Sequence, residues 1–135
     1  MKDELESIVM GSKLPINTHE VAVERVLGGQ ILCVELWTGR YFSSTPEAVN
    51  EAIKAFNDFY RACGQASLND LYTALGLMKT QIGIVFGWSR GNEDFQYSPE
   101  VIHFNTGWIK QDRKLVYFIE FDSEDDFPFA GWEQV

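Results

Sequence analysis

The apolar residues between positions 46 and 63 recur at steps of three and four, which is the spacing of one face of an α-helix. Thr45 is suited to cap the first turn, Pro46 fits the first helical position, and Gly64 stands just beyond the end. The pattern therefore predicts one amphipathic helix of about five turns. Its apolar face consists of Val49, Ile53, Phe56, Tyr60 and Cys63.

Residues 21–42 are rich in β-branched and aromatic side chains, and two turn signals, Gly28-Gly29 and Thr38-Gly39-Arg40, interrupt them. We interpret this region as strand, turn, strand, turn and short strand. A helix over residues 18–27, ending at the first of these glycines, is the competing interpretation, because the apolar residues there also fit a helical face.

Two shorter helices are predicted after the long one. Ser67 is placed to cap a helix over residues 68–75, and Gly76 is the expected left-handed stop. Thr80 can cap a further turn or two over residues 80–86.

The last third of the chain alternates with the period of a strand. Residues 101–104 and 114–121 are predicted as two strands of an antiparallel hairpin, with a turn around Gln111 and Asp112. Within the second strand, Leu115, Tyr117, Ile119 and Phe121 share one side.

These patterns together predict an α+β fold in which an antiparallel sheet packs against the helix at 46–63, with short helices at 68–75 and 80–86. The chain has 135 residues, of which 45% are hydrophobic. This is enough for one domain with its own core. We therefore expect a single domain over residues 1–135, with residues 1–15 as a loosely attached N-terminal segment.

The net charge limits the kinds of partner that the protein is expected to bind. Eleven Lys and Arg against twenty Asp and Glu give a net charge of -9, which repels a phosphate backbone and disfavours direct nucleic-acid binding. No apolar stretch approaches the roughly 20 residues of a membrane span, and the N-terminus is acidic rather than basic and then apolar. We expect a cytoplasmic protein that does not contact membranes.

The cysteine and histidine residues, which are common in catalytic and metal sites, are scattered along the chain. Cys33 and Cys63 lie thirty residues apart, and neither has a partner at metal-ligand spacing. We expect both to be reduced core residues, and we expect no metal and no cofactor. A dyad of Cys63 and His103 is the strongest catalytic alternative, but no local signature of a reactive cysteine accompanies it. A non-enzymatic protein is therefore favoured.

Positions 68–88 read Leu-Asn-Asp-Leu-Tyr, then Leu-Gly-Leu, Thr80, Gly83 and Gly87-Trp88. This resembles L-N-D-x-Y-x-x-L-G-L-x-x-T-x-x-G-x-x-x-G-W, the pattern of a small domain of unknown function in phage and mobile-element proteins of Gram-positive bacteria. The similarity spans residues 67–121. The chain departs from the pattern at Ile84-Val85, where acidic or polar residues are expected. The resemblance implies a small protein in a bacterial host cell that acts by binding other proteins.

The negative charge is concentrated at the C-terminal end, because residues 93–135 hold ten acidic and three basic side chains. One interpretation is a solvated tail. A second is a docking surface in which carboxylates attract a basic partner and aromatic rings hold it. A third is a strap that packs these rings on the protein's own sheet. The candidate partner-binding residues are Glu120, Asp122, Glu124, Asp125, Asp126, Phe127, Phe129 and Trp132.

These observations favour a non-enzymatic protein that binds a protein partner. One form of this hypothesis is an acidic inhibitor that imitates nucleic acid and occludes a basic, nucleic-acid-binding host factor such as a defence nuclease. Another is a structural or accessory component of the mobile element. A small-ligand module is a further alternative, with a cleft formed by Tyr41, Trp88 and Trp108. The oligomeric state stays open.

Overall fold

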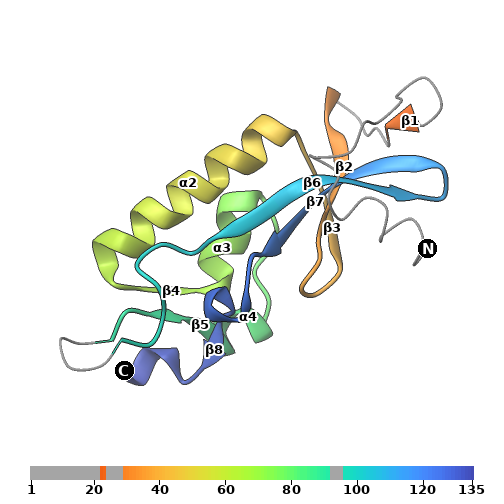
Figure 1. The fold of residues 1–135 in the computed structure, drawn as a ribbon. Helices are drawn as coiled ribbons and strands as arrows, with labels where there is room; N and C mark the ends of the chain where they lie inside the picture. Colours follow the sequence, from red (N-terminus) through yellow and green to blue (C-terminus); the bar gives the residue numbers. More distant parts are fainter. Residues whose placement is uncertain (1–21, 24–28, 92–95) are drawn as a thin grey trace. The chain divides into compact units, whose positions relative to one another are not determined.

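The computed structural model describes residues 22–23, 29–91 and 96–135. The chain divides into two compact units (Figure 1). The first, which we call the sheet unit, consists of Met1–Pro46 and Asn105–Glu120. The second, the helix unit, consists of Glu47–Phe104 and Phe121–Val135. Each unit is therefore built from two separate stretches of chain.

The sheet unit contains the larger of two sheets. Its strands are β1 (Ala22–Val23), β2 (Ile31–Glu35), β3 (Arg40–Ser44), β6 (Phe104–Gln111) and β7 (Lys114–Phe121). The order is β1-β7-β2-β3, and β6 also pairs with β7. The predicted α+β class is confirmed. This sheet is mixed rather than antiparallel throughout, because β7 runs parallel to β1 and β2, while β2 and β3 are antiparallel.

The hairpin of β6 and β7 has a two-residue turn. Asp112 and Arg113 both have positive φ, at 49° and 67°, the backbone that a tight hairpin turn of this length requires. The predicted turn and the second strand are confirmed. The first strand was misplaced at 101–104, because β6 starts at Phe104 and continues through polar positions that do not alternate clearly. Of the contested region 18–27, the structure describes only the strand β1, and the rest lies outside the described residues.

The core of the sheet unit lies around the central strands. It is formed by Val34, Ile109, Val116 and Phe118, all at most 2% exposed. Strand β7 is buried on both faces, so the side that carries Leu115, Tyr117, Ile119 and Phe121 is buried and Val116 and Phe118 on the other side are buried as well. A near-continuous apolar run, here from Leu115 to Ile119, is typical of a strand that is covered on both faces.

The long helix α2 (Pro46–Cys63) has the predicted bounds. Val49, Phe56 and Tyr60 are buried as expected, whereas Cys63 is exposed, which corrects its assignment to the core. Asn57 is also buried, although its side chain is polar. Its amide donates to the carbonyl oxygen of Ile102 and accepts from the Ile102 N–H, at 2.9 Å each. These two bonds compensate the amide for its burial.

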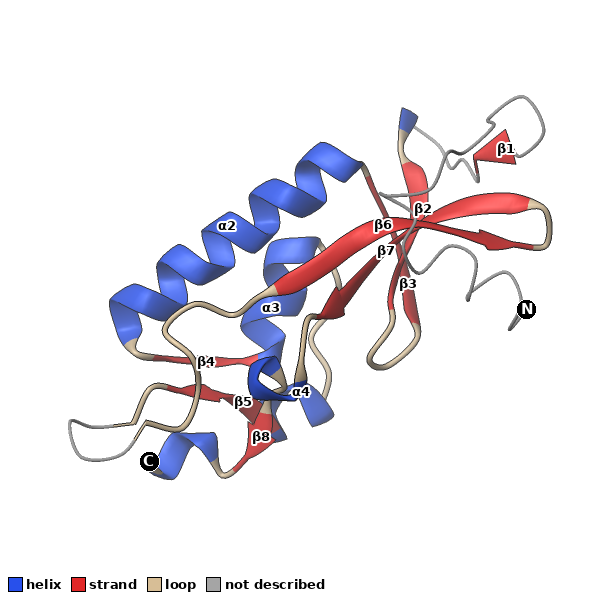
Figure 2. Ribbon diagram, viewed as in Figure 1, coloured by secondary structure: helices blue, strands red, loops and turns tan. Residues whose placement is uncertain are grey.

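The helix unit also contains a three-stranded antiparallel sheet, β4 (Gln65–Ser67), β5 (Phe86–Ser89) and β8 (Phe129–Ala130), in that order (Figure 2). The Phe56 ring of α2 meets the Trp88 ring of β5 edge to face, with 5.0 Å between ring centroids. The predicted packing of the long helix on an antiparallel sheet thus occurs here, on the smaller sheet.

Two short helices follow β4. The first, α3 (Leu68–Leu75), has the predicted bounds and ends at Gly76 in the left-handed conformation. The second, α4 (Ile82–Val85), is shorter than the predicted helix at 80–86, because the chain extends into β5 from Phe86. Two 3-10 turns, η3 (Glu124–Asp126) and η4 (Trp132–Gln134), lie near the C-terminus. Within the described residues, no helix has the length and apolarity needed to span a bilayer.

Candidate protein-binding surface

The acidic run after β7 is only partly a surface. Asp122, Glu124 and Asp125 are exposed, whereas Asp126 is 2% exposed. The Asp126 carboxylate accepts hydrogen bonds from the His103 backbone N–H at 2.9 Å and from the Ser123 hydroxyl at 3.1 Å, and it lies 3.1 Å from Nδ1 of His103. Asp126 therefore holds the helix unit together and is removed from the candidate partner-binding residues.

The C-terminal aromatic residues pack largely on the protein itself. Phe129 lies in β8, opposite Gly87, and stacks on Tyr97 with 5.8 Å between centroids. The indole of Trp132 donates to the carbonyl oxygen of Ile84 at 3.1 Å. A Cβ atom at Gly87 would lie 2.6 Å from the Trp132 ring, so only glycine permits this approach. This is the arrangement of a strap rather than of free anchors.

Two other predicted partner-binding residues are placed differently. Phe127 contacts Phe121, at 5.8 Å between centroids, and keeps 42% of its surface exposed. Glu120 is half-buried at the end of β7 and belongs to the sheet unit. The predicted partner-binding residues that are exposed in the helix unit are therefore Asp122, Glu124, Asp125 and Phe127. We call these four residues the acidic turn.

One of the three residues of the proposed aromatic cleft is not accessible to a ligand. Trp88 is fully buried, and its indole donates to the carbonyl oxygen of Asp126 at 2.9 Å, so it offers no surface to a ligand. Tyr41 is exposed and donates to Gln111 at 2.9 Å, and Trp108 packs edge to face on Tyr117. Trp88 is therefore a core residue, which corrects its place in the ligand-site alternative.

Both cysteines are free thiols, as predicted. Burial raises the pKa of the Cys33 thiol to about 11, and the hydrogen bond with the Ser44 backbone lowers it by less. Cys33 is therefore protonated at neutral pH and is a poor nucleophile. Among the described residues, no group of three or more His, Cys, Asp or Glu side chains is arranged to hold a metal ion.

The motif residues at 67–83 serve to fix a turn. Ser67 and Asp70 form a capping box at the start of α3. The Asn69 side chain accepts from the Thr80 N–H and donates to the Thr80 carbonyl oxygen, at 2.9 Å each. The Thr80 hydroxyl accepts from the Gly83 N–H at 3.0 Å. These bonds hold the chain between α3 and α4 in one conformation.

This fixed segment presents large apolar side chains to solvent. Met78 is 81% exposed, Ile84 is 58% exposed, and Ile82 and Val85 are each about half exposed. These four residues lie in the segment from Met78 to the end of the short helix α4, and we call them the apolar loop. The pattern at 80–86 predicted only a short helix, so this exposed apolar surface was not expected. The signal that could have found it is Ile84-Val85, where the resembling pattern has polar residues.

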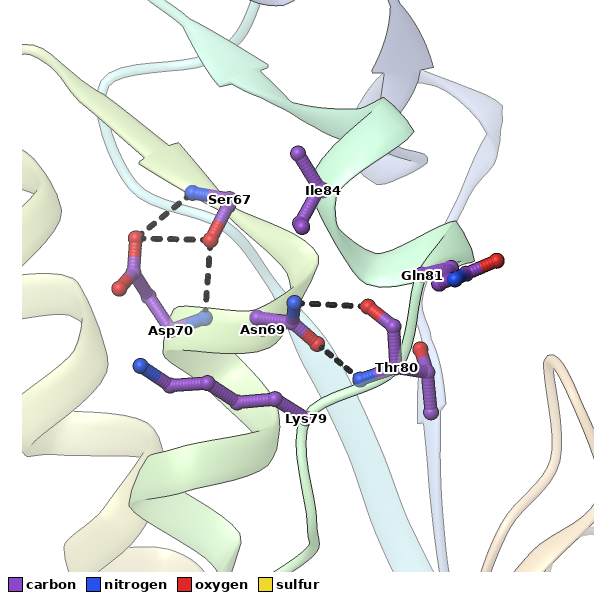
Figure 3. A pocket seen from close by; sticks show the side chains of 7 residues that line it. All are labelled: Ser67, Asn69, Asp70, Lys79, Thr80, Gln81 and Ile84. Carbon is purple, nitrogen blue, oxygen red and sulfur yellow. Dashed lines mark hydrogen bonds between the residues drawn. The ribbon is translucent and has the colours of Figure 1, made fainter.

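A cavity of about 420 Å³ lies beside the apolar loop (Figure 3). The loop contributes Ile84 to its lining. The remaining lining residues are polar or charged: Ser67, Asn69, Asp70, Lys79, Thr80 and Gln81. A smaller cavity of about 240 Å³ lies between α2 and α3. Its lining includes Phe59 and, on a shared rim, Asp70.

A family model matches residues 3–129 and is described as a family of unknown function, DUF6353. The chain belongs to this family. The match takes in both units and extends well beyond residues 67–121, where the resemblance was seen. No curated protein and no solved structure matches the chain. Membership in DUF6353 therefore assigns the chain to a family without assigning an activity.

Proposed function

We propose that this member of DUF6353 is a non-enzymatic protein that acts by binding a protein partner. The observation that carries the proposal is the apolar loop, in which four large apolar side chains are exposed within eight residues. Monomeric proteins rarely expose clusters of large apolar side chains, and such clusters often mark interaction sites.

The fixed conformation of the loop supports the same proposal. Its backbone is held by Asn69 from α3, by the Thr80 hydroxyl, and by the Trp132 indole, which donates to the carbonyl oxygen of Ile84. A surface that is already ordered loses little conformational entropy when a partner binds. The C-terminal strap thus contributes to binding indirectly, because it supports the loop.

The acidic turn favours a basic partner. Asp122, Glu124 and Asp125 are exposed next to the half-exposed ring of Phe127, in a chain whose net charge is -9. Such a surface accelerates encounter with a positively charged protein. Together with the resemblance to phage and mobile-element proteins, this supports inhibition of a basic, nucleic-acid-binding factor in the cytoplasm of a bacterial host.

The second candidate is a structural or accessory component that binds a sister protein of the mobile element. The apolar loop favours it, because permanent assembly contacts are more apolar than transient ones. The two candidates differ in salt dependence. An acidic inhibitor loses affinity steeply as ionic strength rises, whereas an apolar assembly contact does not.

Affinity capture with the full chain tests the proposal. We would immobilise the wild type, the double variant Ile84→Ser/Val85→Ser, and Tyr41→Ser as a control that removes an exposed ring from the sheet unit. Capture from a Gram-positive lysate should retain a protein on the wild type and the control but not on the double variant. If the wild type and the double variant retain the same proteins, the apolar loop is not a binding surface.

The captured partner then separates the two candidates. Its binding to purified wild type would be measured at low and high salt, alongside the triple variant Asp122→Asn/Glu124→Gln/Asp125→Asn. Slower association and a flatter salt dependence in this variant indicate the acidic inhibitor. Asp126 is left unchanged, because it is buried and hydrogen-bonded within the helix unit.

A further inference from the structure

Two charged side chains, Asp70 and Lys79, line the cavity beside the apolar loop, and each keeps polar atoms that bond to no group within the described residues. Oδ2 of Asp70 accepts from the backbone N–H of Ser67 at 2.8 Å and from its hydroxyl at 3.1 Å. Oδ1 of Asp70 accepts no hydrogen bond from the part of the chain that is described, and Lys79 forms no ion pair there. In Figure 3 the Lys79 side chain extends toward Asp70, and no hydrogen bond joins them.

Beside neutral polar side chains such as that of Gln81, the cavity thus offers one charged acceptor, one charged donor and one apolar wall. The acceptor is Oδ1 of Asp70, the donor is Nζ of Lys79, and the wall is Ile84. A peptide group fits this set, because its N–H donates and its carbonyl oxygen accepts. Hydrogen bonds to charged groups are stronger than those between neutral groups.

We infer that this cavity binds an extended polypeptide segment of the partner, with one peptide group between Asp70 and Lys79 and an apolar side chain on Ile84. The inference rests on the proposed function and specifies how the partner is recognised. Alternate side chains of an extended segment point to the same side, so a segment held by its peptide group can place an apolar side chain against the wall.

Other ligand classes match the cavity less well. A phosphate or another anion is repelled by the Asp70 carboxylate, and a metal cation is repelled by the Lys79 ammonium. An apolar ligand would remove both charged groups from water without pairing them, which is unfavourable. A free amino acid carries complementary charges, and the experiment below separates it from a peptide.

The location of the cavity supports a macromolecular occupant. Lys79, Thr80 and Gln81 lie in the same segment as the apolar loop, and Ile84 belongs to both the loop and the cavity lining. A partner that covers the loop therefore also covers the cavity. The hydrogen bonds between Asn69 and Thr80 keep this wall in place before a partner arrives.

An NMR titration of the full chain tests the inference. The probe is the uncharged peptide N-acetyl-Ala-Leu-Ala methylamide, and the signals followed are the Ile84 methyl groups and the Thr80 amide. We expect saturable shifts of both. Asp70→Asn retains an oxygen for Ser67 and places an amide donor in the cavity, and Lys79→Met removes the ammonium. Each substitution should raise the Kd by about tenfold.

Matched controls exist on α2. Lys54 and Asp58 form an exposed ion pair at 3.1 Å, away from the residues that line this cavity. Lys54→Met and Asp58→Asn therefore make the same chemical changes elsewhere and should leave the Kd unchanged. An ester analogue of the probe, which replaces the central N–H with oxygen, should bind about tenfold more weakly than the peptide to the wild type.

Three results of this titration would overturn the inference. The first is the lack of a saturable shift. The second is equal binding by the wild type, Asp70→Asn and Lys79→Met. The third is tighter binding of free leucine than of the blocked peptide, which would make this an amino-acid site. The captured partner gives a separate test. If it does not bind Ile84→Ser/Val85→Ser but binds Asp70→Asn and Lys79→Met as tightly as the wild type, this inference is refuted and the proposed function stands.

Discussion

The side-chain amide of Asn69 exchanges two hydrogen bonds with the backbone of Thr80, each 2.9 Å long. One residue of α3 thereby satisfies both the N–H and the carbonyl group of a residue eleven positions away. The apolar loop and the charged cavity both depend on this contact, because Thr80 lies between Lys79 and α4.

Asn69→Ala should therefore destabilise the helix unit and loosen the loop. Loss of both bonds leaves two backbone groups unpaired, and we expect a decrease in unfolding free energy of about 1–3 kcal/mol. Urea denaturation measures this decrease, and faster amide hydrogen exchange at residues 78–85 reports the loosening. Asn50→Ala, at an exposed position of α2, should change stability by less than about 0.5 kcal/mol.

Gly83→Ala should be destabilising through the same residue. A Cβ atom at Gly83 would overlap the Asn69 amide, and such overpacking costs about 1–3 kcal/mol. Because Asn69→Ala removes the obstructing atoms, Gly83→Ala should cost less in that background. A double-mutant cycle measures the difference, and strict additivity would show that the two residues do not meet.

Phe56→Ala should be the most destabilising single change on α2. The Phe56 ring is 2% exposed and contacts Trp88, Tyr60 and Phe104. Removal of a buried Phe costs about 3–5 kcal/mol. Phe59→Ala, which truncates a half-exposed ring on the same helix, is the matched control and should cost less than about 1 kcal/mol. Equal midpoints of thermal unfolding would mean that the buried face of α2 is misassigned.

Truncation after Phe121 should abolish cooperative folding of the helix unit. It removes β8, the Trp132 contact with Ile84, and Asp126, whose carboxylate and carbonyl groups bond His103 and Trp88. Near-UV circular dichroism and thermal unfolding measure the effect. Removal of residues 133–135 alone should be far milder, because these residues are exposed. A truncated protein that still unfolds cooperatively would contradict the strap.

Stability should fall at alkaline pH, in part through Cys33. Its pKa is raised from 9.0 to about 11 in the folded state by burial. The unfolded chain therefore releases this proton first, so the contribution of Cys33 is complete below pH 9 and is lost as the pH rises toward 11. By pH 10 the loss should be about 1 kcal/mol. Urea unfolding at pH 7 and pH 10 should show a smaller decrease for Cys33→Ala than for the wild type.

Several elements could be predicted from the sequence because they depend on neighbouring residues. Helices α2 and α3 have the expected bounds, the Ser67 cap and the Gly76 stop are in place, and β7 spans residues 114–121. Caps, stops and apolar periodicity act over one or two helical turns. The α+β class followed from the same local patterns.

The candidate site could be predicted only in part. The exposed carboxylates of Asp122, Glu124 and Asp125 were found from charge density alone. Asp126 was misassigned, because its burial depends on His103, twenty-three residues away. The apolar loop was missed, because apolar periodicity alone does not show whether another element covers a residue; only the departure from the resembling pattern at Ile84-Val85 indicated it.

The sequence by itself determined the net charge, the local helices and strands, and the positions of the helix caps. Tertiary structure decided which side chains those elements cover. Asn57 is buried because the Ile102 backbone pairs with it, and the Trp132 ring reaches β5 because Gly87 leaves room for it. The parallel pairing of β2 with β7 is likewise a contact between distant residues. Such contacts depend on the free energy of the whole packed chain, and no short segment encodes them.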